Sequence, residues 1–497
     1  MSSDTPSVSE NDTRKSVSDG AVTIVERVVS QAAQFVIFIM AARILGPAEF
    51  GVFALVSACA ILALRAAEVG WAQYIMNWSG SDEVPRQVLL LSVLCGLLFM
   101  GIGLSAAGVL HLISFSTEIV TLFMVFSLWV WIATVSSAQK GMMIWLGRLK
   151  SSATCEMLGE AVGLAVAAAA LLLDQGVLAL AYGRVAFQST HLLASFWVTR
   201  LWPQMGMTRS IFRDLSTFSA QFFVSRMLIH FRLYVATFII GGFLGPAAVG
   251  YFRAADRLVS AVAELIYVPA QLLAWTNFKR ARDAGPAEDA AARVNLAMGH
   301  WAKGIVLVGV PLFVWVMVMN DQIIEGLLTA TWLPAAPLVA LLAIGRLLLI
   351  FGPATEPIMS VMGQVARLPL FMAFIFVVSV GVTLVSAQFG VVAVAAAQII
   401  VGACGLVATL WLFRRYASIS LRNMARSLKA TALPIACGVL GLLVAEQALM
   451  ASGVHMLVQA VLGGVFAVTV YLIAIYAFDR QTFDILKTMR PKRPAKA

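Results

Sequence analysis

The stretch ILGPAEFGVF, residues 44–53, returns about two hundred residues later as FLGPAAVGYF, residues 243–252. The two copies are 199 positions apart, as Leu45 and Leu244 show (244 minus 45). The same offset aligns further pairs: Val25 with Val224, Arg27 with Arg226, Val36 with Val235, Gly51 with Gly250 and Phe53 with Phe252. Glycine favours helix ends and proline favours first helical turns, so each Gly-Pro pair predicts a sharp connection between two helices. The sequence therefore predicts two related halves, each with a helical hairpin.

The composition is that of a membrane protein. Hydrophobic residues make up 61% of the 497 residues and charged residues only 12%, which is about half the charged share of a soluble domain. A helix that crosses the bilayer needs about 20 apolar residues. Fourteen such runs predict an all-α integral membrane protein, with spans near 21–43, 48–69, 87–110, 117–138, 151–173, 176–199, 215–243, 247–275, 301–320, 334–358, 367–387, 390–413, 431–449 and 456–478.

The two copies are expected to face the same side of the membrane. Six predicted spans lie between them, and an even number of crossings returns the chain to its starting side. The halves are therefore parallel repeats about an axis along the membrane normal. We expect a polar N-terminal segment that is disordered (1–20), an N-lobe of six spans (21–200), a C-lobe of six spans (201–430), a terminal helix pair (431–478) and a basic tail (479–497).

The distribution of the basic residues behind the net charge of +10 indicates which loops lie on the cytoplasmic side of the membrane. Lysine and arginine gather in alternate loops and in both terminal segments, for example at Lys140, Arg209, Lys279, Arg414 and Lys492. Such a bias predicts that these loops and both termini are cytoplasmic. A basic balance distributed in this way does not indicate a nucleic-acid partner.

Several other classes of protein are not supported by the sequence. The first predicted helix opens with Glu26 and Arg27, which does not fit a cleavable signal peptide. The five cysteines stand singly in apolar runs, so we expect no disulfide, metal site or cofactor. There is no G-x-x-x-x-G-K-[ST] phosphate loop. Every predicted outer loop is short, whereas a membrane-bound glycan polymerase or ligase needs room for an acceptor; we therefore expect a transporter, not an enzyme.

The two signatures resemble a known family. The segments AARILGPAEFGVFALVSA and IIGGFLGPAAVGYFRAADRLVSAV look like the paired signatures of polysaccharide-biosynthesis flippases of the Wzx type. These belong to the superfamily of multidrug, oligosaccharidyl-lipid and polysaccharide exporters, which also holds cation-coupled multidrug antiporters and lipid II flippases. The resemblance implies two six-helix bundles that face each other across a central cavity, which opens alternately to each side, plus a terminal helix pair. One departure is Ala236, where family members often place an aspartate.

Ionisable residues at membrane depth are expensive and normally mark functional cavities. Arginine offers a fixed fork of donors that suits phosphate oxygens. The candidates for binding a diphosphate or an anionic glycan are Arg27, Arg184, Arg226, Arg232, Arg257 and Arg346. Basic residues nearer to helix ends can instead extend to the membrane surface without a ligand, and this interpretation is favoured for Arg43, Arg65, Arg253 and Lys303.

Polar residues at helical spacing support the same prediction. Thr23, Arg27, Ser30 and Gln34 recur at intervals of four, three and four, with Gln31 beside them. Thr217, Gln221, Ser225 and Arg232 recur at four, four and seven. Each set occupies one helix face, and we expect both faces to line the cavity.

The acidic residues carry the alternative mechanism, in which carboxylates bind a coupling cation. Glu156 and Glu160 share one face of the fifth predicted span, and Glu356 lies in the tenth. Burial and like-charge proximity can raise a carboxyl pKa enough to bind a proton, but salt bridges to arginines of the cavity are the favoured explanation of these residues. The excess of arginine at membrane depth favours an anionic cargo.

The sequence and its resemblance thus predict a bacterial inner-membrane flippase for a polyprenyl-diphosphate-linked oligosaccharide, serving exopolysaccharide, capsule or O-antigen assembly. Its expected partners are that lipid-linked glycan, membrane lipids, Na⁺ or H⁺ as a coupling ion, and a glycan polymerase with its chain-length regulator. A cation-coupled multidrug antiporter and a lipid II flippase remain alternatives, and a multi-pass polymerase is the least favoured.

Overall fold

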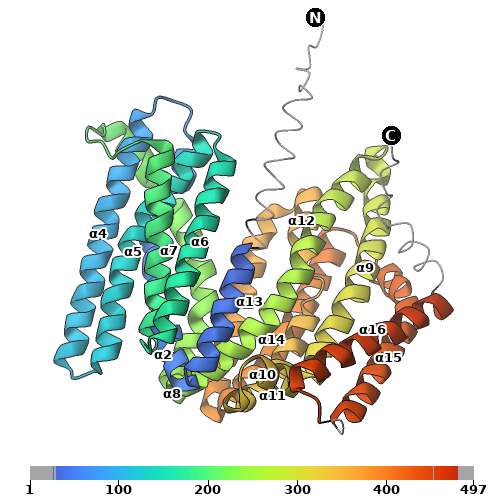
Figure 1. Ribbon diagram of the computed structural model, residues 1–497. Helices are drawn as coiled ribbons and strands as arrows, with labels where there is room; N and C mark the ends of the chain where they lie inside the picture. Colours follow the sequence, from blue (N-terminus) through green and yellow to red (C-terminus); the bar gives the residue numbers. More distant parts are fainter. Residues whose placement is uncertain (1–25, 27–28, 451–452, 480–497) are drawn as a thin grey trace, which may run out of the picture. The chain divides into compact units, whose positions relative to one another are not determined.

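A computed structural model describes residue 26, residues 29–450 and residues 453–479. These residues are almost entirely helical and include no strand (Figure 1). The predicted all-α membrane fold is therefore confirmed. The N-terminal segment 1–20 and residues 480–497 of the tail lie outside the described residues, so the predictions for them stay predictions.

Two compact units divide the chain between Phe238 and Ile239: the N-unit (residues 1–238) and the C-unit (residues 239–497). The N-unit contains the helix Val29–Ile44 and, in order, α2 (Pro47–Glu68), α3 (Trp71–Asn77), α4 (Glu83–Leu112), α5 (Thr117–Trp145), α6 (Leu149–Leu172) and α7 (Leu178–Thr199). The boundary lies inside α8 (Arg209–Asp283).

The C-unit holds the second part of α8 and the remaining helices. These are α9 (Ala290–Val318), α10 (Asn320–Leu327), α11 (Ala336–Leu348), α12 (Thr355–Val361), α13 (Leu368–Ser386), α14 (Val391–Tyr416), α15 (Leu421–Met450) and α16 (Met456–Phe478). Short 3₁₀ turns join several of them: η1 (Ala287–Asp289), η2 (Ala330–Ala335), η3 (Gly352–Ala354), η4 (Val365–Arg367) and η5 (Ala387–Phe389).

Among the described residues, 11 helical segments are long and apolar enough to cross a membrane. Three features separate this number from the fourteen predicted spans. The segment His230–Asp283 is 54 residues long and bends at Gly245, Val29–Ile44 is shorter than a full span, and α7 is not among the 11 segments although it has 22 residues. The count of fourteen stays a prediction.

The two Gly-Pro pairs adopt different backbone conformations. Gly46 has an extended backbone (φ −72°, ψ 163°), and α2 begins at Pro47. Gly245 has φ 81° and ψ 179°, and this single non-helical residue separates the two helical parts of α8. That region of conformational space is open essentially to glycine alone. The repeat in sequence therefore becomes a capped helix start in one copy and a glycine kink in the other.

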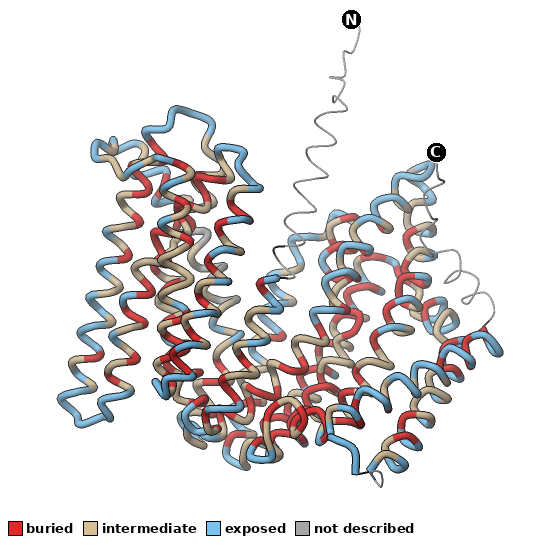
Figure 2. The backbone as a smooth tube through the Cα atoms, viewed as in Figure 1, coloured by how far each residue is buried: buried red, intermediate tan, exposed pale blue. Residues whose placement is uncertain are grey.

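Burial follows helix faces within each unit, as Figure 2 shows by red stripes between neighbouring helices. The N-unit core includes Trp71 of α3, Val88 of α4 and Met142 of α5. In the C-unit, Trp332 and Phe313 are fully buried. Large apolar side chains such as Leu98 and Val377 are more than half exposed, as expected for surfaces that face lipid tails.

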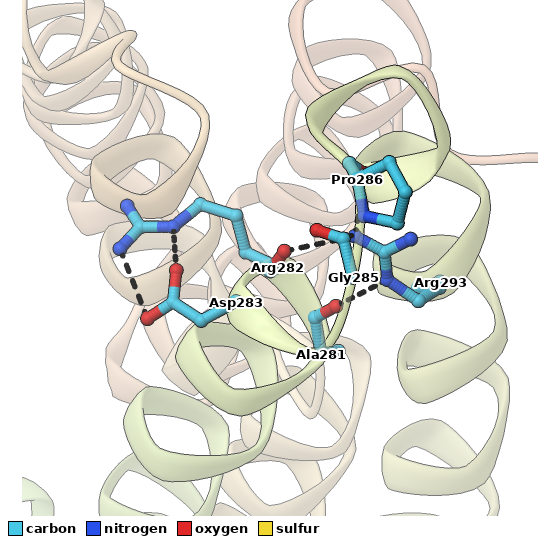
Figure 3. A network of polar contacts seen from close by, with 6 residues as sticks. All are labelled: Ala281, Arg282, Asp283, Gly285, Pro286 and Arg293. Carbon is cyan, nitrogen blue, oxygen red and sulfur yellow. Dashed lines mark hydrogen bonds and ion pairs between the residues drawn. The ribbon is translucent and has the colours of Figure 1, made fainter.

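The connection between α8 and α9 is held by one arginine (Figure 3). The Arg293 guanidinium donates to the backbone carbonyls of Ala281 at 2.9 Å, Arg282 at 3.0 Å, Gly285 at 3.1 Å and Pro286 at 2.9 Å. The last carbonyls of a helix lack intrahelical hydrogen-bond donors. The Arg293 guanidinium provides donors for the carbonyls at the end of α8. The short connection between the end of α8 and η1, residues 284–286, is thus a tightly capped turn.

The last helix packs against α9 through polar contacts at several levels. Lys303 Nζ lies 2.7 Å from Asp479 Oδ2, the Tyr471 hydroxyl donates to the Leu307 carbonyl at 2.8 Å, and the Trp315 indole donates to the Ala460 carbonyl at 2.9 Å. The predicted terminal pair, α15 and α16, is therefore an integral part of the C-unit.

Candidate functional site

The segment Ala330–Val361 of the C-unit is a broken span. Its main helix, α11, ends at Leu348, and α12 starts only at Thr355. Pro353 lies in the break, where its ring and its missing N–H prevent a regular helix from continuing. Breaks of this kind at membrane depth persist where they are buried in protein or line a cavity, and transporters commonly build substrate sites beside them.

Arg346 lies in the last turn of α11, directly before this break. Its position is fixed by a close helix contact, because a Cβ added to Gly402 of α14 would lie 2.5 Å from the carbonyl oxygen of Gly345. Only glycine lets the two backbones approach so closely. Small residues of this kind are typical of helix interfaces in membranes.

A polar face of α8 meets the broken span. Asp256, Ser260, Tyr267 and Gln271 follow one another at intervals of four, seven and four residues, which places them on one side of the helix. Arg346 Nη2 donates to Asp256 Oδ1 at 3.1 Å and to Ser260 Oγ at 3.4 Å. The Tyr267 hydroxyl donates to the Arg346 backbone carbonyl, and Gln271 Nε2 donates to Glu356 Oε2 at 3.2 Å. We call these six residues the α8–α11 site.

Arg346 is the cationic side chain of the α8–α11 site, beside the carboxylates of Asp256 and Glu356, and its guanidinium is the group that could bind an anion. Asp256 is shared, since its second oxygen lies 3.6 Å from Arg253 Nη1. The Arg346 side chain is 40% exposed, against 23% for Asp256. All hydrogen bonds from the Arg346 guanidinium to described side chains start at Nη2. Arginine has five N–H donors. The donors on Nε and Nη1 of Arg346 meet no acceptor among the described side chains, and they can donate to oxygens of a ligand.

A second polar cluster lies in the N-unit between α5, α6 and α7. Glu156 of α6 pairs with Lys140 of α5, and its Oε2 lies 3.9 Å from Nε2 of His191 on α7. The other ring nitrogen of His191 is hydrogen-bonded to the Ser136 hydroxyl. His191 is only 2% exposed. The Glu156 carboxylate is thus paired with the Lys140 ammonium, with a buried imidazole within ion-pair distance.

Glu160, one turn after Glu156, is also engaged. Its Oε1 accepts a hydrogen bond from Gln34 Nε2 at 3.1 Å, which links α6 to the helix Val29–Ile44. The charge of Arg184 acts on Glu160 as well. Two candidate residues of the N-unit, Gln34 and Glu160, thus lie together, whereas Arg184 and Gln31 are exposed.

For the other predicted site residues the structure gives less detail. Arg232 and Arg257 are half-buried and both interact with other groups of the protein. Arg27 lies outside the described residues, and the side chains of Gln221, Ser225 and Arg226 lie outside the described side chains. The predictions for these residues stay predictions.

Sequence reasoning did not single out Ser260, Tyr267, Gln271, Ser136 or His191. Three of them share the helical spacing of Asp256, so a search for polar faces in the eighth span could have found them. Ser136 and His191 belong to short polar stretches (136–140 and 188–191) whose spacing indicates no particular site. No group of three potential metal ligands occurs within the described part of the chain.

Comparison with known proteins identifies related sequences and folds. A family model described as a polysaccharide biosynthesis protein matches residues 39–337. No curated protein sequence matches the chain. The fold is similar to that of the lipid II flippase MurJ in an inward closed conformation, with a TM-score of 0.71 and 13% identity over 94% of this chain and 99% of that one.

Two further solved structures share the fold. An inward-facing multidrug resistance MATE family transporter of the MOP superfamily gives a TM-score of 0.59 and 16% identity, over 78% of this chain and 95% of that one. A MOP superfamily transporter from Pyrococcus furiosus gives 0.52 and 14%, over 80% and 93%. The chain therefore has the fold of this transporter superfamily.

Proposed function

Because this chain belongs to the polysaccharide biosynthesis protein family, whose model matches more than half of it, we propose that it flips a polyprenyl-diphosphate-linked oligosaccharide across the inner membrane. The family match is the observation that carries this proposal. The fold supports it, since the neighbours of this chain include a lipid II flippase.

The α8–α11 site is our candidate for the diphosphate. A guanidinium stays charged even when partly buried and binds two phosphate oxygens at once. Arg346 has N–H donors that meet no acceptor among the described side chains, it is partly exposed, and it lies beside a helix break within a membrane span. In this mechanism the polyprenyl tail stays in the lipid while the diphosphate and sugars cross by alternating access. Both termini lie in the cytoplasm, as the positive-inside bias indicates.

A conditional-depletion strain tests the proposal. Lipid-linked oligosaccharide is labelled metabolically, and its exposure on each face of inner-membrane vesicles is measured with an impermeant sugar-modifying enzyme. We expect depletion to leave the glycan on the cytoplasmic face, where mass spectrometry then identifies it. Unchanged export would rule out this cargo.

Cation-coupled drug export is the second candidate function. It is favoured by the N-unit cluster, where Glu156 lies between Lys140 and His191, and by the fold shared with a multidrug transporter. The same depletion strain distinguishes the two functions. Unchanged glycan export together with increased sensitivity to cationic drugs would make Glu156, Glu160 and Glu356 the residues to mutate.

A further inference from the structure

We propose that Asp256 is an internal competitor for the anionic group that Arg346 binds. Its carboxylate holds the guanidinium when the α8–α11 site is empty, gives way to a phosphate of the cargo, and returns when the cargo leaves. This inference rests on the proposed function and adds the regulation of the site to it.

The geometry of the pair is that of a contact that can be exchanged. Strong arginine–carboxylate pairs join two N–H groups to two oxygens in parallel. Here Asp256 Oδ1 accepts from Nη2 alone, at 3.1 Å, and the same nitrogen also donates weakly to Ser260 at 3.4 Å. The second carboxylate oxygen is turned to Arg253 at 3.6 Å. A single carboxylate thus lies beside two guanidinium groups and meets each of them through one oxygen.

A diphosphate is the better ligand for the same position. It carries more negative charge than one carboxylate and offers several oxygens, so it can engage Nε and Nη1 of Arg346 as well as Nη2. The carboxylate has the opposite advantage, because it is tethered to α8 and its effective concentration at Arg346 is always high. Cargo therefore binds, but less tightly than it would to an uncompensated arginine.

This arrangement suits a transporter, which must release its cargo on the far side. A site that binds too tightly would hold the diphosphate and slow each cycle. Asp256 lowers the affinity by supplying an alternative partner at the moment of release. A purely structural ion pair between α8 and α11 makes a different prediction, because its loss would loosen the helix contact without strengthening anion binding.

The test is binding of inorganic pyrophosphate to the full-length protein in nanodiscs, measured by isothermal titration calorimetry. We expect Asp256→Asn to bind pyrophosphate about tenfold more tightly than the wild type, because a charged partner of Arg346 is lost. Asp256→Glu, which keeps a carboxylate, should stay close to the wild type. In vesicles, Asp256→Asn should also flip lipid-linked glycan more slowly at saturating substrate.

The control is Glu68→Gln in the N-unit. It removes one negative charge from another half-buried arginine pair, Arg65–Glu68, and so raises the net charge equally. We expect it to leave pyrophosphate affinity unchanged. Equal gains in Asp256→Asn and Glu68→Gln would reduce the effect to net charge and overturn the inference.

The remaining outcomes separate this inference from the proposed function. If pyrophosphate binds the wild type, Arg346→Gln abolishes that binding, and Asp256→Asn binds no more tightly, the competition is refuted while the anion site stands. If neither the wild type nor Asp256→Asn binds pyrophosphate, the diphosphate site itself is refuted. A thermal melt without ligand checks that each variant is folded, and Asp256→Ser, which also removes the carboxylate, takes the place of Asp256→Asn if that variant does not fold.

Discussion

Arg346 shows how much of a candidate function rests on single residues. Its guanidinium is placed by the Gly345–Gly402 contact on one side and by Asp256 and Ser260 of α8 on the other. Its backbone carbonyl accepts from Tyr267, which fixes the end of α11 against α8. Charge, donor geometry and position relative to the helix break thus coincide at one side chain.

We expect Arg346→Gln to lower glycan export at least tenfold, because the variant keeps a polar but shorter side chain and loses the charge and the fork of donors. Arg346→Lys should recover only part of the activity, since an ammonium cannot bind two oxygens in a plane. Export is measured in the depletion strain, with protein level in the membrane checked by immunoblot. Arg65→Gln, at a charged pair far from the site in the sequence, serves as the matched control. Wild-type export by Arg346→Gln would remove Arg346 from the mechanism.

At the scale of elements, the Gly-Pro motif has two structural outcomes. In the first copy the Gly46 N–H donates to Glu49 Oε2 at 3.1 Å, which caps the start of α2. In the second copy Ala248 stands at the position of Glu49, so no such cap is available, and Gly245 bends α8 instead. The same short motif therefore caps the start of a helix in one copy and bends a helix in the other.

The two glycines should respond differently to alanine. Gly245→Ala forces a β-carbon into a backbone region that only glycine occupies readily, at a cost of about 1 to 3 kcal/mol. Gly46→Ala meets no such strain, since its φ of −72° suits any residue and no atom lies within 4 Å of the added carbon. Thermal unfolding in detergent should show a clearly lower melting temperature for Gly245→Ala only. Equal melting temperatures would refute the strain at the kink.

At the scale of the whole molecule, the chain is built as two units, and the C-unit includes the terminal helix pair. The contacts of α16 with α9 at Lys303, Leu307 and Trp315 fall on one face of α9, at intervals of four and eight. An ion pair closes this interface at its end, where Asp479 is almost fully buried. The last two helices are therefore held as part of the unit and do not hang freely from it.

Breaking this ion pair should destabilise the C-unit. Lys303→Met removes the ammonium that lies 2.7 Å from the buried Asp479 carboxylate, and removing one member of a buried pair costs about 3 to 5 kcal/mol. The double variant Lys303→Met, Asp479→Leu should recover much of the loss, because no isolated charge remains. Melting temperatures in detergent, with limited proteolysis between α15 and α16, would reveal the change. A single variant as stable as the wild type would show that the pair contributes little.

The candidate site was only partly predictable from the sequence. Arg346 and Glu356 stood out because charges are rare in apolar spans. The carboxylate oxygens of Asp256 lie near Arg346 and Arg253, and the sequence analysis did not predict these contacts. Tyr267 and Gln271 were missed, since uncharged polar residues are common in membrane helices. Pairings across 79 to 90 positions of chain depend on how helices pack, which composition does not encode.

The sequence by itself determined that the chain is an all-α membrane protein, that its Gly-Pro signature recurs, and which family it resembles. These follow from local physics: apolar runs long enough for a bilayer, helix-ending residues and the scarcity of charge. Only the tertiary structure decided which charges meet. It split α11 from α12, brought Asp256 to Arg346, and joined Lys303 to Asp479. Such contacts arise between helices distant in sequence, where close packing and the cost of an unpaired charge in lipid select the partners.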